Sequence, residues 1–254
     1  MMSMTKVRAF FVEHILNKTV GRYYRIREEL LEKHVLKPKK PQIWPILVER
    51  SLVDTAEFIE QNMLNTATCC FSRLEIIELA IANLEYTDPS NVRVYEFGVW
   101  EGKSIKIFAQ KLPEGAIFGF DSFRGLPVSW TGTHTRAGYF DLGGKIPNSI
   151  SGVNLVEGLF SESFPNFYHN FPLERDHRID LLHMDADIYE STKEALIFFA
   201  ARIRSGSLIL FDEFFGYPNW RQHEFRAFNE FCNENRIKFE YIAFTTRQVL
   251  LRIL

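Results

Sequence analysis

The stretch Tyr95-Glu-Phe-Gly-Val-Trp-Glu-Gly102 decides the fold of this 254-residue chain. It predicts a buried strand that ends in a glycine turn and leads into a helix. A second predicted strand follows and ends at Gly119-Phe-Asp-Ser122. In a doubly wound sheet such a turn lets the backbone close on a nucleoside, and the acid at the second strand's tip accepts hydrogen bonds from ribose hydroxyls. Glu96 and Asp121 are the acids in this arrangement.

The glycine spacing separates two kinds of nucleoside ligand. The pattern here is Glu-x-Gly-x-x-x-Gly, from Glu96 through Gly98 to Gly102. The pyrophosphate of a dinucleotide needs Gly-x-Gly-x-x-Gly instead, so that the backbone can approach the phosphates. The departure favours S-adenosylmethionine, which carries no phosphate, over NAD. An NAD oxidoreductase is therefore the least favoured enzyme class.

Size and composition suit one α/β domain with an accessory segment. Apolar residues make up 46% of the chain and charged residues 24%, which is ordinary for a soluble globular protein. No apolar run approaches the ~20 residues of a transmembrane helix, and the first residues lack the order of a signal peptide. The three cysteines, Cys69, Cys70 and Cys232, fit no metal-binding spacing. We expect a reducing, cytoplasmic location.

Charge is distributed unevenly along the chain. Residues 1–40 hold 10 Lys and Arg against 4 Asp and Glu, a net charge of +6, so the whole-chain total of −2 leaves −8 for residues 41–254. The acidic body argues against nucleic acid as a substrate, because binding a phosphate backbone needs a basic surface. We expect the basic arm to dock on the acidic body, with a membrane surface as the less favoured partner. The sequence leaves homodimer formation open.

The chain divides into two parts at residue 88. We expect residues 1–88 to form a helical segment, consisting of the basic arm and a cap, and residues 89–254 to form the cofactor-binding domain. Helices are predicted in the first part over 5–36, 47–62 and 72–85. The last of these begins with a capping box, in which Ser72 is followed three residues later by Glu75.

Strands and helices alternate from residue 92 onward. This alternation predicts an α/β, doubly wound, mostly parallel sheet of seven strands with helices on both faces. The strands are expected at 92–97, 116–121, 153–157, 180–185, 206–212, 237–243 and 247–253, and the helices at 102–112, 161–170, 189–203 and 219–235. The tight connection at Thr245-Thr246 makes the last two strands an antiparallel C-terminal hairpin. The loop over 122–152 has a length typical of active-site lids or of disordered segments.

Two further predicted strands end abruptly in acids. Asp185 follows Leu181-Leu-His-Met184, and Asp212 and Glu213 follow Leu208-Ile-Leu-Phe211. Ligands of open α/β sheets bind beyond the carboxyl ends of the strands, so we expect these acids to share one crevice. Asp187 should point to the same side as Asp185 if the chain stays extended. Carboxylates gathered in this way need a cation or a retained proton, and oxygen ligands suit Mg²⁺.

These motifs together resemble the TylF/macrocin O-methyltransferase family of class I S-adenosylmethionine-dependent methyltransferases. The resemblance covers residues 92–254 and, loosely, the helices before them. It is carried by Tyr95-Glu-Phe-Gly-Val-Trp-Glu-Gly-Lys-Ser104, Gly119-Phe-Asp-Ser-Phe-Arg-Gly-Leu-Pro127, Val156-Glu-Gly-Leu-Phe160, His183-Met-Asp-Ala-Asp-Ile-Tyr-Glu-Ser-Thr192 and Phe211-Asp-Glu-Phe-Phe-Gly-Tyr-Pro218. It implies a Rossmann-like fold and methyl transfer to a sugar hydroxyl of a polysaccharide, glycolipid or glycosylated natural product.

The resemblance also implies roles for individual residues. The implied S-adenosylmethionine contacts are Glu96, Gly98, Gly102 and Ser104 at the methionine end, Asp121 at the ribose, Ser122 and Phe123 near the adenine, and Gly158 and Phe160 on the far side of the base. The implied Mg²⁺ ligands are Asp185, Asp212 and Glu213, and Asp187 falls at the position of the general base. Family members often carry Asp-Asp where this chain has Asp212-Glu213, so the strength of the metal site is left open.

Two alternative functions stay open at this point. A catechol-type O-methyltransferase also uses a metal and two neighbouring oxygens, and a flat apolar acceptor slot would favour it over a polar, aromatic-edged one. A noncatalytic cofactor-binding or scaffold protein of a sugar-assembly complex would use the basic arm for docking. The presence of both Asp185 and Asp187 argues against the scaffold, because a decayed site is free to lose them.

Overall fold

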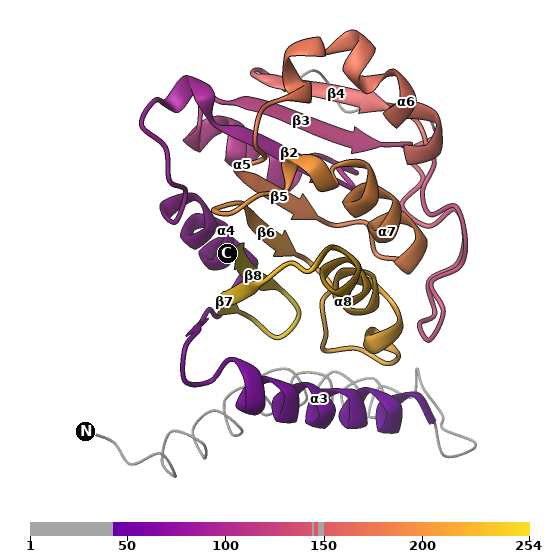
Figure 1. The fold of residues 1–254 in the computed structure, drawn as a ribbon. Coiled ribbons are helices and arrows are strands. Elements are labelled where there is room, and N and C mark those ends of the chain that lie inside the picture. Colours follow the sequence, from indigo (N-terminus) through magenta and orange to yellow (C-terminus); the bar gives the residue numbers. More distant parts are fainter. Residues whose placement is uncertain (1–42, 144, 147–149) are drawn as a thin grey trace.

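The computed structural model describes residues 43–143, 145–146 and 150–254. The helix predicted over 5–36 and the basic arm lie outside these residues. Within them, one eight-stranded sheet has the order β1-β7-β8-β6-β5-β2-β3-β4 (Figure 1). Its strands are β1 (Thr68–Cys69), β2 (Arg93–Phe97), β3 (Ala116–Asp121), β4 (Val153–Glu157), β5 (Leu181–Met184), β6 (Leu208–Phe211), β7 (Phe239–Phe244) and β8 (Val249–Ile253).

The sheet confirms the predicted doubly wound topology. Strands β6, β5, β2, β3 and β4 run parallel to one another, and β8 runs antiparallel to both β6 and β7. The seven predicted strands are all present. The eighth, β1, was not predicted: its two residues pair with Ala243 and Phe244 at the edge of the sheet, and two residues are too short to show an alternating pattern.

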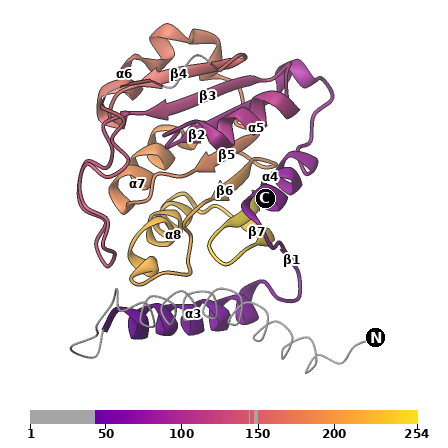
Figure 2. The same ribbon diagram turned by 180° about the vertical axis from the view of Figure 1, so that it is seen from behind.

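Helices cover both faces of the sheet, as Figures 1 and 2 show from opposite sides. The helices α4 (Arg73–Ala82) and α5 (Lys103–Lys111) lie on one face, and α6 (Phe160–Asn170), α7 (Tyr189–Phe198) and α8 (Glu224–Asn235) lie on the other. Helix α3 (Ile43–Asn62) runs along the end of the molecule beside α8. No helix in the described ranges is long and apolar enough to cross a membrane.

Some helix boundaries differ from the sequence prediction. The helix predicted over 189–203 ends at Phe198, and a short 3-10 helix continues at Ala200–Arg202. The helix predicted over 219–235 is interrupted at His223, between a 3-10 turn at Trp220–Gln222 and α8. At α4 the hydroxyl of Ser72 accepts a hydrogen bond from the amide of Glu75, as predicted. The Glu75 carboxylate, however, bonds the amide of Phe71, one residue before the cap.

Strand alternation sorts the side chains of the central strands between two cores. Tyr95 and Phe97 of β2 join the core under α6, α7 and α8. Val94 joins the core under α4 and α5, and Glu96 therefore shares that face. His183 of β5 pairs in register with Glu96 and points the same way. The sheet thus buries two ionisable residues on its α4/α5 face, directly before the strand ends.

Candidate active site

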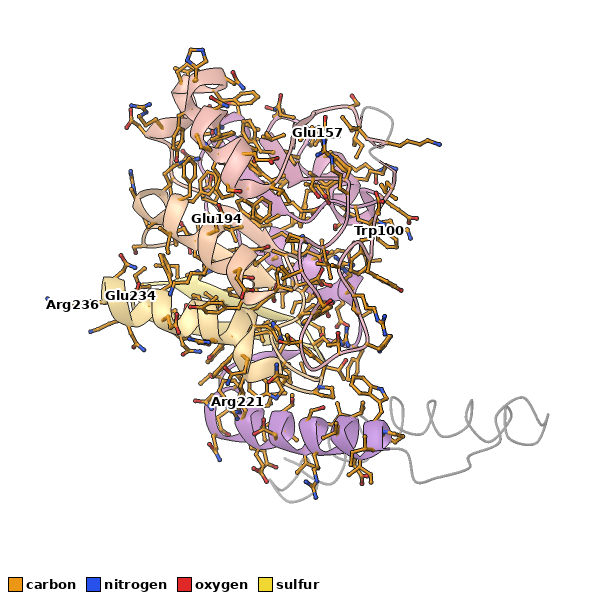
Figure 3. The ribbon with its side chains drawn as sticks, turned by 90° about the vertical axis from the view of Figure 1, so that its right-hand side faces the viewer. Trp100, Glu157, Glu194, Arg221, Glu234 and Arg236 are labelled. Carbon is orange, nitrogen blue, oxygen red and sulfur yellow. The ribbon has the colours of Figure 1, made fainter. Side chains whose placement is uncertain are left out.

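A cavity of about 450 Å³ opens at the carboxyl ends of the parallel strands. Figure 3 faces this edge, with Trp100 of the glycine turn labelled. The predicted site residues that line the cavity are Gly98, Asp121, Ser122, Gly158, Phe160, Asp185, Asp187, Asp212 and Glu213. Its size lies within the range of small-molecule sites. The topology therefore brings the glycine turn and the acid cluster, far apart in the sequence, to one cavity.

Asp121 holds the glycine turn in place. Its Oδ2 accepts hydrogen bonds from the amides of Val99 at 2.8 Å and Trp100 at 2.7 Å. Its Oδ1 accepts from the amide of Phe123 at 2.7 Å. A carboxylate offers about four lone-pair positions, so these three bonds leave room for about one more donor, such as a hydroxyl of a bound nucleoside.

Gly98 sits where the turn meets the end of β5. Its φ is +94°, and a Cβ added there would lie 1.8 Å from the carbonyl oxygen of Asp185. No other residue type fits that approach without moving the backbone. The glycine spacing noted in the sequence therefore has a structural cause: it lets the cofactor turn and the acid-bearing strand come together.

Four of the implied cofactor contacts do not line the cavity. They are Glu96, Gly102, Ser104 and Phe123. Gly102 is the cap of α5, with φ at +74°, and Ser104 is buried in that helix's first turn. Phe123 lies in the core under α4 and α5 rather than at a face open to an adenine. Glu96 is fully buried behind the turn. These residues shape the cavity's wall from behind.

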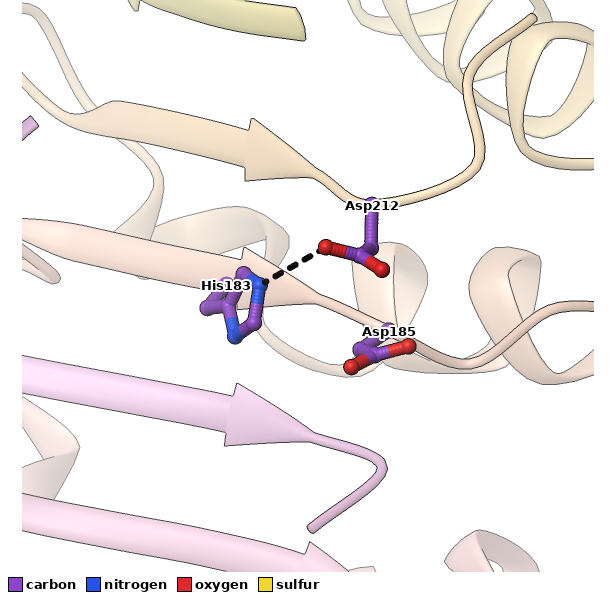
Figure 4. A group of neighbouring side chains, drawn as sticks. All are labelled: His183, Asp185 and Asp212. Atoms are coloured by element: carbon purple, nitrogen blue, oxygen red, sulfur yellow. Dashed lines mark ion pairs between the residues drawn. The ribbon is translucent and has the colours of Figure 1, made fainter. Parts of the chain in front are cut away.

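Glu96 and His183 form a buried pair between β2 and β5. The His183 Nδ1 lies 2.9 Å from the Glu96 Oε2, and neither side chain reaches solvent. Burial by itself lowers the pKa of His183, but Asp212 and Glu96 outweigh it and raise that pKa to about 9. The neighbouring acids therefore favour the protonated ring. Its Nε2 lies 3.8 Å from the Asp212 Oδ1, an ion-pair distance (Figure 4).

Asp185 and Asp212 stand at the tips of neighbouring strands, as predicted, because β5 and β6 pair directly. Arg73 bridges them: its Nη2 donates to the Asp185 Oδ2 at 2.5 Å, and its Nε lies 3.0 Å from the Asp212 Oδ1. Gln248 also donates to Asp212. Burial alone would raise the pKa of Asp212, but His183 and Arg73 bring it below its usual value. Burial and Asp212 raise the pKa of Asp185 to about 7.

Asp187 reaches the cluster by a turn and not by an extended chain, which corrects the sequence expectation. Its φ is +62°, and the amide of Ile188 bonds back to the carbonyl of Ala186 at 2.6 Å. Asp187 nevertheless places an oxygen within 4.8 Å of both Asp185 and Glu213. Burial, followed by Asp185 and Asp212, raises the pKa of Asp187 well above its usual value. The strained backbone here is a common sign of a functional position.

The donor set fits a hard divalent cation. The carboxylates of Asp185, Asp187 and Glu213 place oxygens within 4.8 Å of one another, and a second group of potential ligand atoms comes from His183, Asp185 and Asp212. The implied ligands Asp212 and Glu213 therefore fall in different groups. The Glu213 Oε2 is buried without a hydrogen-bond partner, and burial raises the pKa of this acid well above its usual value. Three crowded carboxylates with an unpartnered oxygen are the donors that Mg²⁺ prefers. Asp185 would be the ligand common to both groups.

Aromatic side chains line the other half of the cavity. They come from α3, from the glycine turn after β2, from the loop over 122–152 and from the segment after β6: Trp44, Trp100, Trp130, His134, Tyr139, Phe140 and Tyr217. Thr133 and Thr135 stand among them and add polar groups. The Trp44 and His134 rings meet edge to face at 5.7 Å, so the start of α3 closes against the loop. Residues 122–140 of the loop thus form one wall of the cavity, as expected for a lid.

Sequence reasoning missed three charged residues of the site. Arg73 directly follows the recognised helix cap Ser72, but nothing local ties it to acids more than 100 residues away. Arg247 lies in the β7–β8 turn, 3.5 Å from Glu213. Glu224 begins α8, is fully buried, and accepts a hydrogen bond from the amide of Glu213. In the sequence, the only sign that Glu224 belongs to the site is that it lies close to the predicted acids Asp212 and Glu213.

Comparison with known proteins agrees with this geometry. A protein-family model described as "Methyltransferase domain" matches residues 95–214, so this part of the chain is similar to that family. No curated protein sequence matches the chain.

Solved structures share the fold. CalS11, titled a calicheamicin methyltransferase, is 22% identical, with a TM-score of 0.54 over 89% of this chain and 90% of its own. The O-methyltransferase NovP is 17% identical, with a TM-score of 0.53 over 71% and 78%. An apo structure of CalS11, titled a TDP-rhamnose 3'-O-methyltransferase, is 19% identical, with a TM-score of 0.50 over 89% and 92%.

Proposed function

We propose that the protein is an S-adenosylmethionine-dependent O-methyltransferase that methylates a sugar hydroxyl with the help of Mg²⁺. The sugar would belong to a polysaccharide, a glycolipid or a glycosylated natural product. One observation carries the proposal: the Asp121-held glycine turn and the acid cluster face one cavity. The TylF-type motifs, the match to a methyltransferase family and the structural similarity to CalS11, a TDP-rhamnose 3'-O-methyltransferase, support it.

Different residues of the cavity would bind the cofactor and the metal ion. The Gly98 turn leaves backbone close to the cofactor, and Asp121 has about one acceptor position left for a ribose hydroxyl. S-adenosylmethionine supplies the methyl group, and Mg²⁺ lowers the pKa of a coordinated hydroxyl. Asp185, Asp212 and Glu213 would hold the ion. Asp185 is the residue common to both groups of potential ligands.

Proton removal falls to Asp187. It is buried, lines the cavity, and lies beside the acids that would hold the metal and the acceptor. A carboxylate in that position takes the hydroxyl proton as the methyl group transfers. The aromatic wall keeps water out and positions the acceptor for in-line displacement.

The lining favours a sugar over a catechol as acceptor. A catechol needs a flat apolar slot, whereas Thr133, His134 and Thr135 put polar groups along the aromatic edge. Aromatic rings beside hydrogen-bonding side chains suit the mixed apolar and hydroxyl faces of a sugar ring. We also propose that α3, from the segment before residue 89, forms the cap of the 89–254 domain, because its Trp44 and Val48 line the cavity.

The test combines binding and turnover. Calorimetric titration with S-adenosylmethionine and, separately, NAD should show micromolar binding of the former only. Methyl-labelled cofactor should then label nucleotide sugars or glycosides in Mg²⁺, lose that activity in EDTA, and regain it when Mg²⁺ is restored. Labelling of catechols alone would favour the catechol enzyme. Full activity in EDTA would make the acid cluster an ordinary polar contact, and no binding of either cofactor would overturn the proposal.

A further inference from the structure

Arg73 enters the acid cluster from the first turn of α4. One guanidinium contacts two carboxylates from different strands, Asp185 after β5 and Asp212 after β6. The planar fork of arginine suits such a bridge better than the point charge of lysine. Arg73 also lines the cavity with these acids. The carboxylates that would hold a divalent ion are therefore already bound by a cation of the chain itself.

The burial of the three groups is unequal. The Arg73 side chain is 43% exposed, whereas that of Asp185 is 22% and that of Asp212 is 7% exposed. The acids are fixed at strand ends, but the arginine is attached to the cluster by a long side chain that borders solvent. Of the three groups, Arg73 is the one with room to leave.

Charge makes Arg73 and a divalent ion competitors. Asp185 accepts from Arg73 and is the one acid present in both groups of potential ligands. Two cations sharing that carboxylate at ~4–5 Å would repel strongly, even at the effective dielectric constant of a protein surface. Without any cation, the neighbouring carboxylates of Asp185 and Asp212 would repel each other instead.

We propose that Arg73 is a displaceable counter-cation: it holds Asp185 and Asp212 together until a divalent ion exchanges with it. The inference rests on the proposed function, because it concerns the proposed metal site. Arg73 is a positioning residue in this scheme, since it acts through the two acids and not on the acceptor. Ion binding then includes the work of releasing the guanidinium, so the native chain binds the ion more weakly than its ligands alone would.

The experiment measures ion binding and not turnover. Mn²⁺ serves as the probe, and the free ion is counted by electron paramagnetic resonance as it is titrated into full-length protein. Arg73→Gln keeps a polar side chain without the charge, and Arg73→Met keeps an unbranched apolar side chain without the charge. The matched control is Arg221→Met. Arg221 is also 43% exposed and pairs with an acid, Asp54, but it lies beside α3, away from Trp100 (Figure 3).

We expect both Arg73 variants to bind Mn²⁺ at least ~tenfold more tightly than the native chain, a change of about 1.4 kcal/mol. The control should bind as the native chain does. The double variant Arg73→Gln with Asp185→Asn should lose this gain in Mn²⁺ affinity, which would show that the gain arises at the acid cluster. Circular dichroism confirms that each variant is folded.

Equal or weaker binding by Arg73→Gln and Arg73→Met would overturn the exchange. The absence of Mn²⁺ binding by every protein in the series would overturn it as well. A parallel titration with S-adenosylmethionine keeps the two proposals apart. Normal cofactor binding together with unchanged Mn²⁺ affinity would refute the role of Arg73 and leave the methyltransferase proposal standing.

Discussion

His183 and Glu96 face each other across β5 and β2, with Nδ1 2.9 Å from Oε2 and both side chains fully buried. They are paired in register, immediately before the strand ends that carry the cavity. The Glu96 Oε1 has no hydrogen-bond partner. A buried carboxylate of this kind is tolerated because an imidazolium beside it supplies the opposite charge. The pair thus fixes the spacing of the two strands beneath the acid cluster.

Replacing Glu96 by Gln should destabilise the protein by about 3 kcal/mol, because a buried imidazolium loses its closest counter-charge. The free energy of unfolding is obtained from urea titration. The control is Glu114→Gln, since Glu114 is exposed in the turn before β3. A loss no greater than that of the control would mean that His183 is held by Asp212 alone.

Gly98→Ala should destabilise the protein by more than the strain of a side chain at a positive φ alone. The φ of Gly98 is +94° and that of Gly138 is +78°, so a side chain is strained at either position. An added Cβ meets the carbonyl of Asp185 at 1.8 Å in the first case and nothing within 4 Å in the second. We expect Gly98→Ala to cost a further ~1–3 kcal/mol over Gly138→Ala and to weaken S-adenosylmethionine binding. Equal losses of stability and affinity would show that the turn and β5 separate easily.

The sequence was sufficient to predict the sheet and the position of the site. The apolar runs of three strands end at Asp121, Asp185 and Asp212, where the strands leave the core and reach the ligand-binding edge of the sheet. This change from apolar to acidic residues is visible in the sequence. Strand alternation could also have predicted that Glu96 lies opposite His183, because each residue is the second to last of its strand.

Contacts made across the fold were beyond sequence reasoning. Arg73 reaches Asp185 only because α4 packs beside the ends of β5 and β6, and no local pattern encodes that approach. The turn at Asp187 depends on a left-handed residue that is not glycine, which propensity does not predict. Most of the aromatic wall comes from a loop without periodicity, so the sequence did not indicate which of its aromatic side chains line the cavity.

Asp187→Asn should preserve cofactor affinity and remove most turnover. The amide matches the carboxylate in size but does not accept the hydroxyl proton, so the rate should fall by about 10²–10⁴-fold. Calorimetry measures the binding of S-adenosylmethionine, and transfer of a labelled methyl group measures the rate. The control is Asp176→Asn, at an exposed position before β5. An unchanged rate would remove Asp187 from the chemistry and leave it as a ligand or a packing group.

Glu230 should give the protein an acid-sensitive link between α7 and α8. Its carboxylate accepts hydrogen bonds from Lys193, Tyr189 and Arg226, which lower its pKa from 4.5 to about 2. The folded pKa lies below the unfolded one, so this stabilisation is complete above about pH 4.5 and is lost as the pH falls towards 2.

Glu230→Gln tests that link by its pH dependence. Because the carboxylate is 30% exposed, solvent screening limits its contribution to at most about 1 kcal/mol. The native chain should exceed the variant in unfolding free energy at about pH 7, and the difference should shrink by about pH 3 and in high salt. Glu234→Gln, at an exposed position on the same helix (Figure 3), should show no such trend. A difference that stays constant with pH would mean that Glu230 joins the helices by shape and hydrogen bonding, not by its charge.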